Sequence, residues 1–175
     1  YKARDEKDKS LAQETAALIK ELKAQADALG VSYSHSHSCG NASARDVAAL
    51  RCFEACEILG SRYLVIHPIV SVDKVTIKDD EEFIRINAEA IRELLPYAKE
   101  FGVKIALENM WQNPVEGVIG HSTCSRPDEF IRYLDELNND AFVGCLDIGH
   151  AEMRGLNTSA VEMIKALGPR LGALH

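Results

Sequence analysis

Two short apolar runs in this chain each end abruptly in an acidic residue. Residues 103–107 read Val-Lys-Ile-Ala-Leu and lead into Glu108, and residues 141–146 read Ala-Phe-Val-Gly-Cys-Leu and lead into Asp147. Short apolar runs bounded by turn residues are typical of buried strands, most often parallel ones. A carboxylate at the end of such a strand lies at the edge of a core, where it needs a partner. The pattern predicts a buried parallel sheet with acids along one edge.

Histidines extend the same pattern. Apolar runs also precede His67 and His175, and His150 follows Asp147 by three positions. Each residue alone has an ordinary interpretation, such as a strand-end carboxylate that caps the next turn or a loop histidine. Several on successive strand ends favour a metal site, because carboxylate oxygen and imidazole nitrogen together suit a divalent ion such as Mn, Co, Fe or Zn. The main candidates are Glu108, Asp147, His150 and His175.

Helical and strand patterns alternate along the chain. The predicted helices cover residues 10–29, 43–60, 80–100, 127–137 and 158–167, and the predicted strands cover residues 31–37, 62–66, 103–108, 141–147 and 171–174. Strict alternation with short strands indicates parallel βαβ units. Five strands are compatible with an open doubly wound sheet, but no glycine-rich phosphate fingerprint follows any strand. Functional-looking residues at the carboxyl ends of all five strands favour a (β/α)8 barrel.

A complete barrel of this kind needs roughly 250 residues, and this chain has 175. We therefore expect residues 1–175 to be a single domain and the central fragment of an α/β parallel (β/α)8 TIM barrel. The fragment would contain about strands 2–6 with the intervening helices, and would lack the first strand and the last two.

Composition excludes some classes of function. The net charge of -7 and the isoelectric point near 5.4 disfavour binding to nucleic acid or to an anionic membrane, both of which favour a basic face. No apolar run approaches the roughly 20 residues that span a bilayer. The five cysteines are scattered and include no C-x-x-C pair. We expect reduced thiols and a cytoplasmic location.

Three further residues are weaker candidates for substrate binding. His37 and His67 both end predicted strands and are expected to face the same pocket, although each is equally consistent with a supporting or core histidine. Because side chains alternate along a strand, His37 is expected nearer the mouth than His35. Trp111 follows Glu108 closely and would form a wall for a polyol, or would plug the rim of the barrel.

These motifs resemble the xylose isomerase-like TIM-barrel superfamily of sugar phosphate isomerases and epimerases, which also contains the endonuclease IV fold. The resemblance covers essentially the whole chain. The motifs that carry it are residues 64–68, residues 96–103 running into residues 107–109, residues 145–151 and residues 171–175.

The resemblance implies roles for individual residues. In that family, the residues that match Glu108, Asp147 and His175 bind the metal, and a fourth ligand, a glutamate on the eighth strand, has no counterpart here. The residue matching His150 contacts substrate in the epimerases and binds metal in the nuclease branch. The residues matching His37 and His67 are metal ligands in the nuclease branch and pocket residues elsewhere.

The resemblance also implies a reaction. It points to an isomerase or epimerase of a small sugar or sugar phosphate, dependent on Mn, Co, Mg or Zn, that removes a proton next to a carbonyl through an enediolate. Glu108 would serve as ligand and base, and His150 would orient a hydroxyl. The alternatives are an inosose dehydratase-like lyase, an endonuclease IV-like phosphodiesterase acting on abasic DNA, and a non-catalytic barrel. The fragment alone is expected to be inactive, and assembly into a homo-oligomer is left open.

Overall fold

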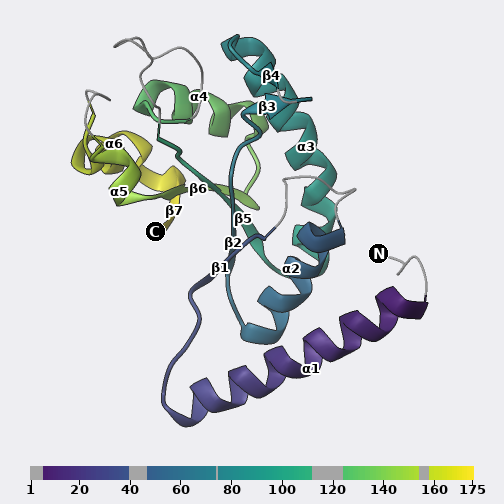
Figure 1. Ribbon diagram of the computed structural model, residues 1–175. Coiled ribbons are helices and arrows are strands. Elements are labelled where there is room, and N and C mark those ends of the chain that lie inside the picture. The colour runs from purple at the N-terminus through teal and green to yellow at the C-terminus, as the bar shows by residue number, and fades with distance from the viewer. Residues whose placement is uncertain (1–5, 40–46, 74, 112–123, 154–157) are drawn as a thin grey trace.

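Five parallel strands form half of a barrel, with helices between them (Figure 1). The computed structural model describes residues 6–39, 47–73, 75–111, 124–153 and 158–175. The strands lie side by side in chain order, and each is parallel to its neighbour, so that all carboxyl ends meet at one edge. They are β1 (His35–His37), β2 (Tyr63–Ile66), β5 (Lys104–Glu108), β6 (Phe142–Leu146) and β7 (Leu171–Leu174).

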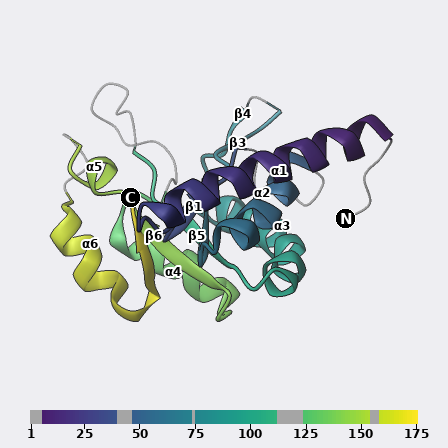
Figure 2. The same ribbon diagram turned by 90° about the horizontal axis from the view of Figure 1, so that it is seen from below.

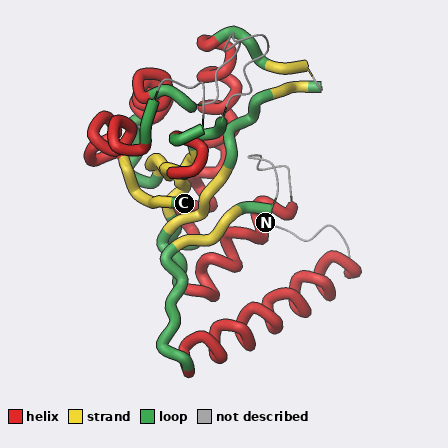
Figure 3. Tube along the Cα trace, turned by 60° about the vertical axis from the view of Figure 1, so that its left-hand side comes forward, coloured by secondary structure: helices red, strands yellow, loops and turns green. Residues whose placement is uncertain are grey.

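The helices alternate with these strands along the trace (Figure 3). They are α1 (Glu6–Ala28), α2 (Val47–Leu59), α3 (Asp80–Glu100), α4 (Pro127–Leu137) and α6 (Ala160–Leu167). Local sequence fixes their starts. Asp79 accepts a hydrogen bond from the Glu82 amide at the start of α3, and Ser159 accepts one from the Glu162 amide at the start of α6. The helix α1 lies along α2, as the views from two sides show (Figures 1 and 2).

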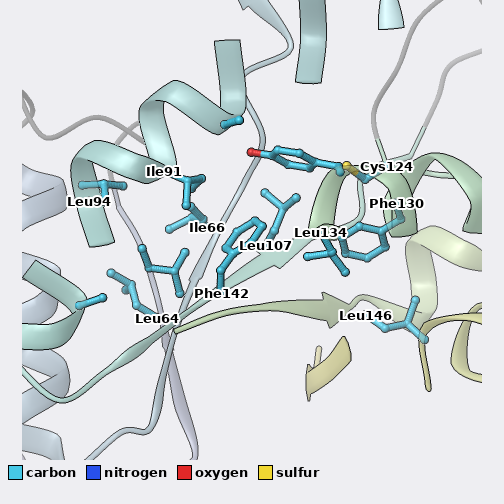
Figure 4. Close-up of a cluster of buried hydrophobic side chains, with 14 of the residues drawn as sticks. Leu64, Ile66, Ile91, Leu94, Leu107, Cys124, Phe130, Leu134, Phe142 and Leu146 are labelled. Atoms are coloured by element: carbon cyan, nitrogen blue, oxygen red, sulfur yellow. The ribbon is translucent and has the colours of Figure 1, made fainter. Parts of the chain in front are cut away.

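The main core lies between the sheet and the helices α2, α3, α4 and α6. Alternate strand residues, such as Leu64 and Leu107, point towards Ile91 of α3 and Phe130 of α4 (Figure 4). The residues between them point to the opposite, inner face of the half-barrel, because strand side chains alternate. There, Val65, Ala106 and Cys145 form a second, smaller buried cluster.

The structure confirms the order of the predicted elements and corrects several boundaries. The first strand covers only the last three residues of the predicted range 31–37. The helix α3 contains Pro96 and continues to Glu100, as the predicted range does. A hairpin of β3 (Ser71–Val72) and β4 (Val75–Thr76) and a short helix α5 (Ile148–Ala151) were not predicted. The first residues of the predicted helix 43–60 lie outside the described residues.

The five cysteines are free thiols, as predicted. Among the described residues, no helix combines the length and the apolar character that crossing a membrane requires. Four leucines of α1 and the turn after it are largely exposed, and these are Leu11, Leu18, Leu22 and Leu29.

Gly172 permits the close approach of β6 and β7, and its replacement by alanine is expected to destabilise the fold. A Cβ at this position would lie 2.5 Å from Cγ2 of Val143 and 3.1 Å from Cε1 of Tyr63. Overpacking of this kind costs about 1–3 kcal/mol, which urea denaturation of Gly172→Ala measures. Combining it with Val143→Ala should recover part of the loss. If the double variant loses as much unfolding free energy as the two single variants together, the proposed clash is contradicted.

Candidate metal centre

Every strand of the half-barrel places at the same edge one histidine or acidic side chain of a type that can bind a metal. Parallel pairing produces this arrangement, because each side chain lies at or just after the carboxyl end of its strand. In strand order, these residues are His37, His67, Glu108, Asp147 and His175. Residues separated by more than 130 positions in the sequence therefore surround a common point.

Glu108 lies at the centre of this cluster and is 1% exposed. Its Oε2 atom lies 3.0 Å from Nε2 of His37 and 3.3 Å from Nε2 of His67. Its Oε1 atom lies 3.2 Å from Nδ1 of His175 and 3.5 Å from Nδ1 of His150. One buried carboxylate thus faces four imidazole nitrogens.

Asp147 follows β6, which lies between the strand of Glu108 and the strand that leads to His175. Its Oδ2 atom is 3.5 Å from Nδ1 of His175 and 3.8 Å from Nδ1 of His150. Its Oδ1 atom accepts a 2.7 Å hydrogen bond from the amide of His150 and so caps the short helix α5. The cap fixes the position of the carboxylate. It also fixes the start of α5, the helix that carries His150.

The electrostatics of the cluster keep Glu108 ionised. Burial by itself would raise the pKa of Glu108, but hydrogen bonds from His67, His175 and His37 outweigh it and lower the pKa to about 2. The neighbouring thiol responds in the opposite direction. Burial and the charges of Glu108 and Asp147 raise the pKa of Cys145 to about 12. The inner face of the half-barrel therefore carries a negative field that a cation would offset.

The proton positions at His37 test whether a cation fits. Nδ1 of His37 lies 2.9 Å from the carbonyl oxygen of Ser38, which can only accept, so this nitrogen carries the hydrogen. In neutral His37, Nε2 then presents a lone pair to the Glu108 carboxylate 3.0 Å away. Such a pair is stable only with a positive species, either a second proton on His37 or a metal ion bound by both atoms.

The spacing and chemistry of the donor atoms fit a divalent ion. Two ligands of one ion at bond lengths of about 2.0–2.2 Å lie roughly 3–3.5 Å apart, as the nitrogen and oxygen atoms around Glu108 do. Two overlapping sets of three such residues share Glu108. They are His37, Glu108 and His175, and Glu108, Asp147 and His150. Mixed imidazole and carboxylate ligands suit the Mn, Co and Zn class of ions.

The remaining predicted residues lie beside the cluster. The ring of Trp111 lies 4.7 Å from that of His150, and Trp111 is 38% exposed. The ring of His35 lies 6.0 Å from that of His175, and in the part of the chain that the structure describes no hydrogen bond or ion pair joins His35 to Glu108. The structure thus brings together every residue predicted for the site.

Sequence reasoning missed one buried polar residue here. Asn109, which is fully buried, hydrogen-bonds through its side chain to the backbone of Asp147. Asn109 belongs to the motif 107–109 that carries the resemblance, but no role was predicted for it.

A family profile described as "Xylose isomerase-like TIM barrel" matches residues 2–175. The chain belongs to this family. Its half-barrel of five parallel strands is the fold expected of a segment of such a barrel, and this confirms the resemblance and the fold class inferred from the sequence.

The individual proteins that this chain resembles have low sequence identity to it. The inosose isomerase of Bacillus subtilis (strain 168) is 28% identical over 124 residues, which cover 70% of this chain and 40% of that protein. The crystal structure of a D-psicose 3-epimerase in the presence of D-fructose has a TM-score of 0.69 at 16% identity, over 91% of this chain and 57% of that one. An IOLI protein with a bound zinc atom has a TM-score of 0.62 at 22% identity, over 84% and 51% of the two chains.

These matches differ in what they establish. The two structural similarities, at identities this low, establish the fold alone. The chain spans about 40% of the length of the curated relative and a little over half of each structural neighbour.

Proposed function

We propose that the protein is a divalent-metal-dependent isomerase or epimerase of a small sugar or sugar phosphate. It would remove a proton next to a carbonyl and return it elsewhere, through an enediolate of the substrate. The observation that carries the proposal is the buried Glu108 carboxylate, which meets Asp147 and four histidines at the edge where barrel enzymes hold their substrates. The inosose isomerase and epimerase among its relatives support the class of reaction.

In this proposal, Glu108, Asp147 and His175 hold the ion, which would be Mn, Co, Mg or Zn. The zinc atom in the related IOLI structure supports a divalent ion. When bound, the ion supplies Lewis acidity towards a substrate carbonyl and hydroxyl. A fourth ligand from the eighth strand would complete the site in a whole barrel, since the five strands described here would be strands 2–6.

The chain's own residues would bind and orient the sugar. His37 and His67 have side chains that are 33% and 47% exposed, so their rings are open to a substrate while they contact Glu108. Trp111 would form an apolar wall against the carbon chain, next to His150. His150 would orient one hydroxyl through a hydrogen bond.

Glu108 has two proposed roles, and the geometry supports them unequally. Its burial, its low pKa and its histidine contacts favour the role of metal ligand. A base works best with a pKa near the working pH. The role of base therefore stays a prediction, which requires the pKa of Glu108 to rise when substrate displaces the histidines.

The test is an exchange experiment on the complete protein loaded with Mn²⁺. A panel of aldoses, ketoses and an inosose is incubated in deuterium oxide, and NMR follows the carbon-bound proton next to each carbonyl. Exchange or isomerisation of at least one sugar, lost on adding a chelator, is the expected result. A protein that binds Mn²⁺ but exchanges no sugar of the panel would contradict the proposal.

One observation favours a second candidate, a metal-dependent phosphodiesterase acting on abasic DNA. His37, His67 and Glu108 form one contact group, and their counterparts in the nuclease branch of the resemblance are metal ligands. The net charge of -7 opposes this reading, because DNA binding favours a basic groove. Cleavage of an abasic strand by a protein that exchanges no sugar would support it.

Replacing His150 with alanine is expected to raise KM and to lower turnover by about 10–1000-fold. The reason is the loss of the hydrogen bond that orients a substrate hydroxyl, while Glu108, Asp147 and His175 stay in place. Steady-state kinetics on the exchanging sugar measures both constants. His35→Ala is the matched control, because this histidine lies on the same face of β1 as His37 but starts the strand, and within the described ranges no hydrogen bond or ion pair joins it to either carboxylate. Unchanged constants in His150→Ala would remove this residue from the substrate site.

A further inference from the structure

Asn109 uses its side-chain amide and its backbone amide to join the ends of β5 and β6. Its side-chain Oδ1 accepts a 2.7 Å hydrogen bond from the amide of Asp147, and its Nδ2 donates to the carbonyl oxygen of the same residue at 3.2 Å. Its own amide donates to the carbonyl oxygen of Cys145 at 3.3 Å. The side chain thus continues the parallel sheet for one more residue beyond β5.

The carbonyl oxygen of Asn109 has a separate partner, Nδ1 of His150, at 2.8 Å. A carbonyl oxygen only accepts, so Nδ1 of His150 carries the hydrogen. In the neutral imidazole, the other nitrogen, Nε2, is then the atom with the free lone pair. Nδ1 is also the nitrogen of His150 that faces Glu108 and Asp147, at 3.5 and 3.8 Å.

We propose that Asn109 is a positioning residue that holds Asp147 beside Glu108 and commits His150 to the Nδ1–H tautomer. The inference rests on the proposed function and deepens it. A nitrogen that donates to the Asn109 carbonyl has no lone pair for an ion, so Nδ1 of His150, the nitrogen that faces Glu108 and Asp147, is not a metal ligand. The Nε2 atom of His150 is left as an acceptor for a substrate hydroxyl.

Only asparagine satisfies both groups of Asp147. Alanine would leave the partly buried amide and carbonyl of Asp147 without their Asn109 partners, at up to about 1–3 kcal/mol each. Aspartate would keep the acceptor but place an oxygen against the Asp147 carbonyl, and would add a third negative charge beside two carboxylates. The strand β7 restrains this segment differently, because its backbone bonds join His175 to Leu146 and Ile148 and not to Asp147 itself.

The first test is calorimetry of Mn²⁺ binding to the complete protein and to Asn109→Ala. Loss of an outer-shell partner of this kind typically weakens metal binding by 10–100-fold, and we expect a loss in that range. The matched control is Asn87→Ala. Asn87 is also buried, and its amide likewise accepts from and donates to the backbone of one residue, Ile69, away from Asp147. The control is expected to lose stability but to bind Mn²⁺ close to normally.

The second test is ¹⁵N NMR of the histidine rings in the metal-free protein at about pH 8, above the usual pKa of histidine. We expect a protonated Nδ1 and an unprotonated Nε2 for His150. An Nε2–H tautomer, or an Asn109→Ala variant that loses no more Mn²⁺ affinity than Asn87→Ala, would overturn the inference. Neither readout uses a substrate. A failure of the proposed sugar chemistry would therefore leave this inference standing, and the reverse also holds.

Discussion

Replacing Glu108 with glutamine is expected to abolish exchange of the substrate's carbon-bound proton with solvent deuterium, with a fall in rate of at least about 10³-fold. Glutamine keeps the shape of the side chain. It removes the charge that offsets a cation, and it removes the oxygen that would accept a proton. Both proposed roles of Glu108 therefore predict the loss. The measurement is deuterium incorporation by the complete protein, followed by NMR under saturating Mn²⁺.

Calorimetry on the same variant separates the two roles. Lost exchange with retained Mn²⁺ affinity assigns Glu108 as the base, whereas loss of both assigns it as a ligand. The matched control is Glu129→Gln, which changes another buried glutamate that accepts a hydrogen bond from the Cys124 amide. This control should exchange at a rate close to that of the unchanged protein. Exchange at the unchanged rate in Glu108→Gln would place the base and the ion elsewhere.

Replacing Asp147 with asparagine is expected to weaken Mn²⁺ binding by at least about 100-fold, because the neutral amide no longer offsets the charge of the ion. Oδ1 of asparagine still accepts from the His150 amide, so the start of α5 should survive. Asp79→Asn is the control, since Asp79 caps α3 through the same kind of bond to Glu82. Calorimetry showing equal affinities in Asp147→Asn and Asp79→Asn would remove Asp147 from the ion's ligands.

The strands of the barrel were predictable because burial on both faces requires nearly continuous runs of apolar residues. The run from residue 103 to Glu108 and the run before Asp147 show this directly. The hairpin of β3 and β4 was not predicted, because each strand has two residues, too few to show any periodicity. The helix α5 was not predicted for a similar reason, since its four residues make a single turn.

The site was predictable to the extent that it depends on strand ends. Parallel order alone brings Glu108, Asp147 and His175 to one edge. The close contact of His37 and His67 with one oxygen of Glu108 depends on rotamers and on the curvature of the sheet, which no spacing encodes. The role of Asn109 depends on hydrogen bonds to a backbone 38 positions away, and a sequence pattern carries no record of such bonds.

The placement of Glu108, Asp147 and His175 at the ends of three neighbouring strands has a thermodynamic consequence. An ion held between these side chains ties together segments that unfolding must separate, so unfolding has to release the ion. By mass action, an ion present at 100 times its dissociation constant adds about 2.7 kcal/mol to the stability of the fold. Melting curves recorded with one cation at a time would therefore rank the ions by affinity, before any substrate is known.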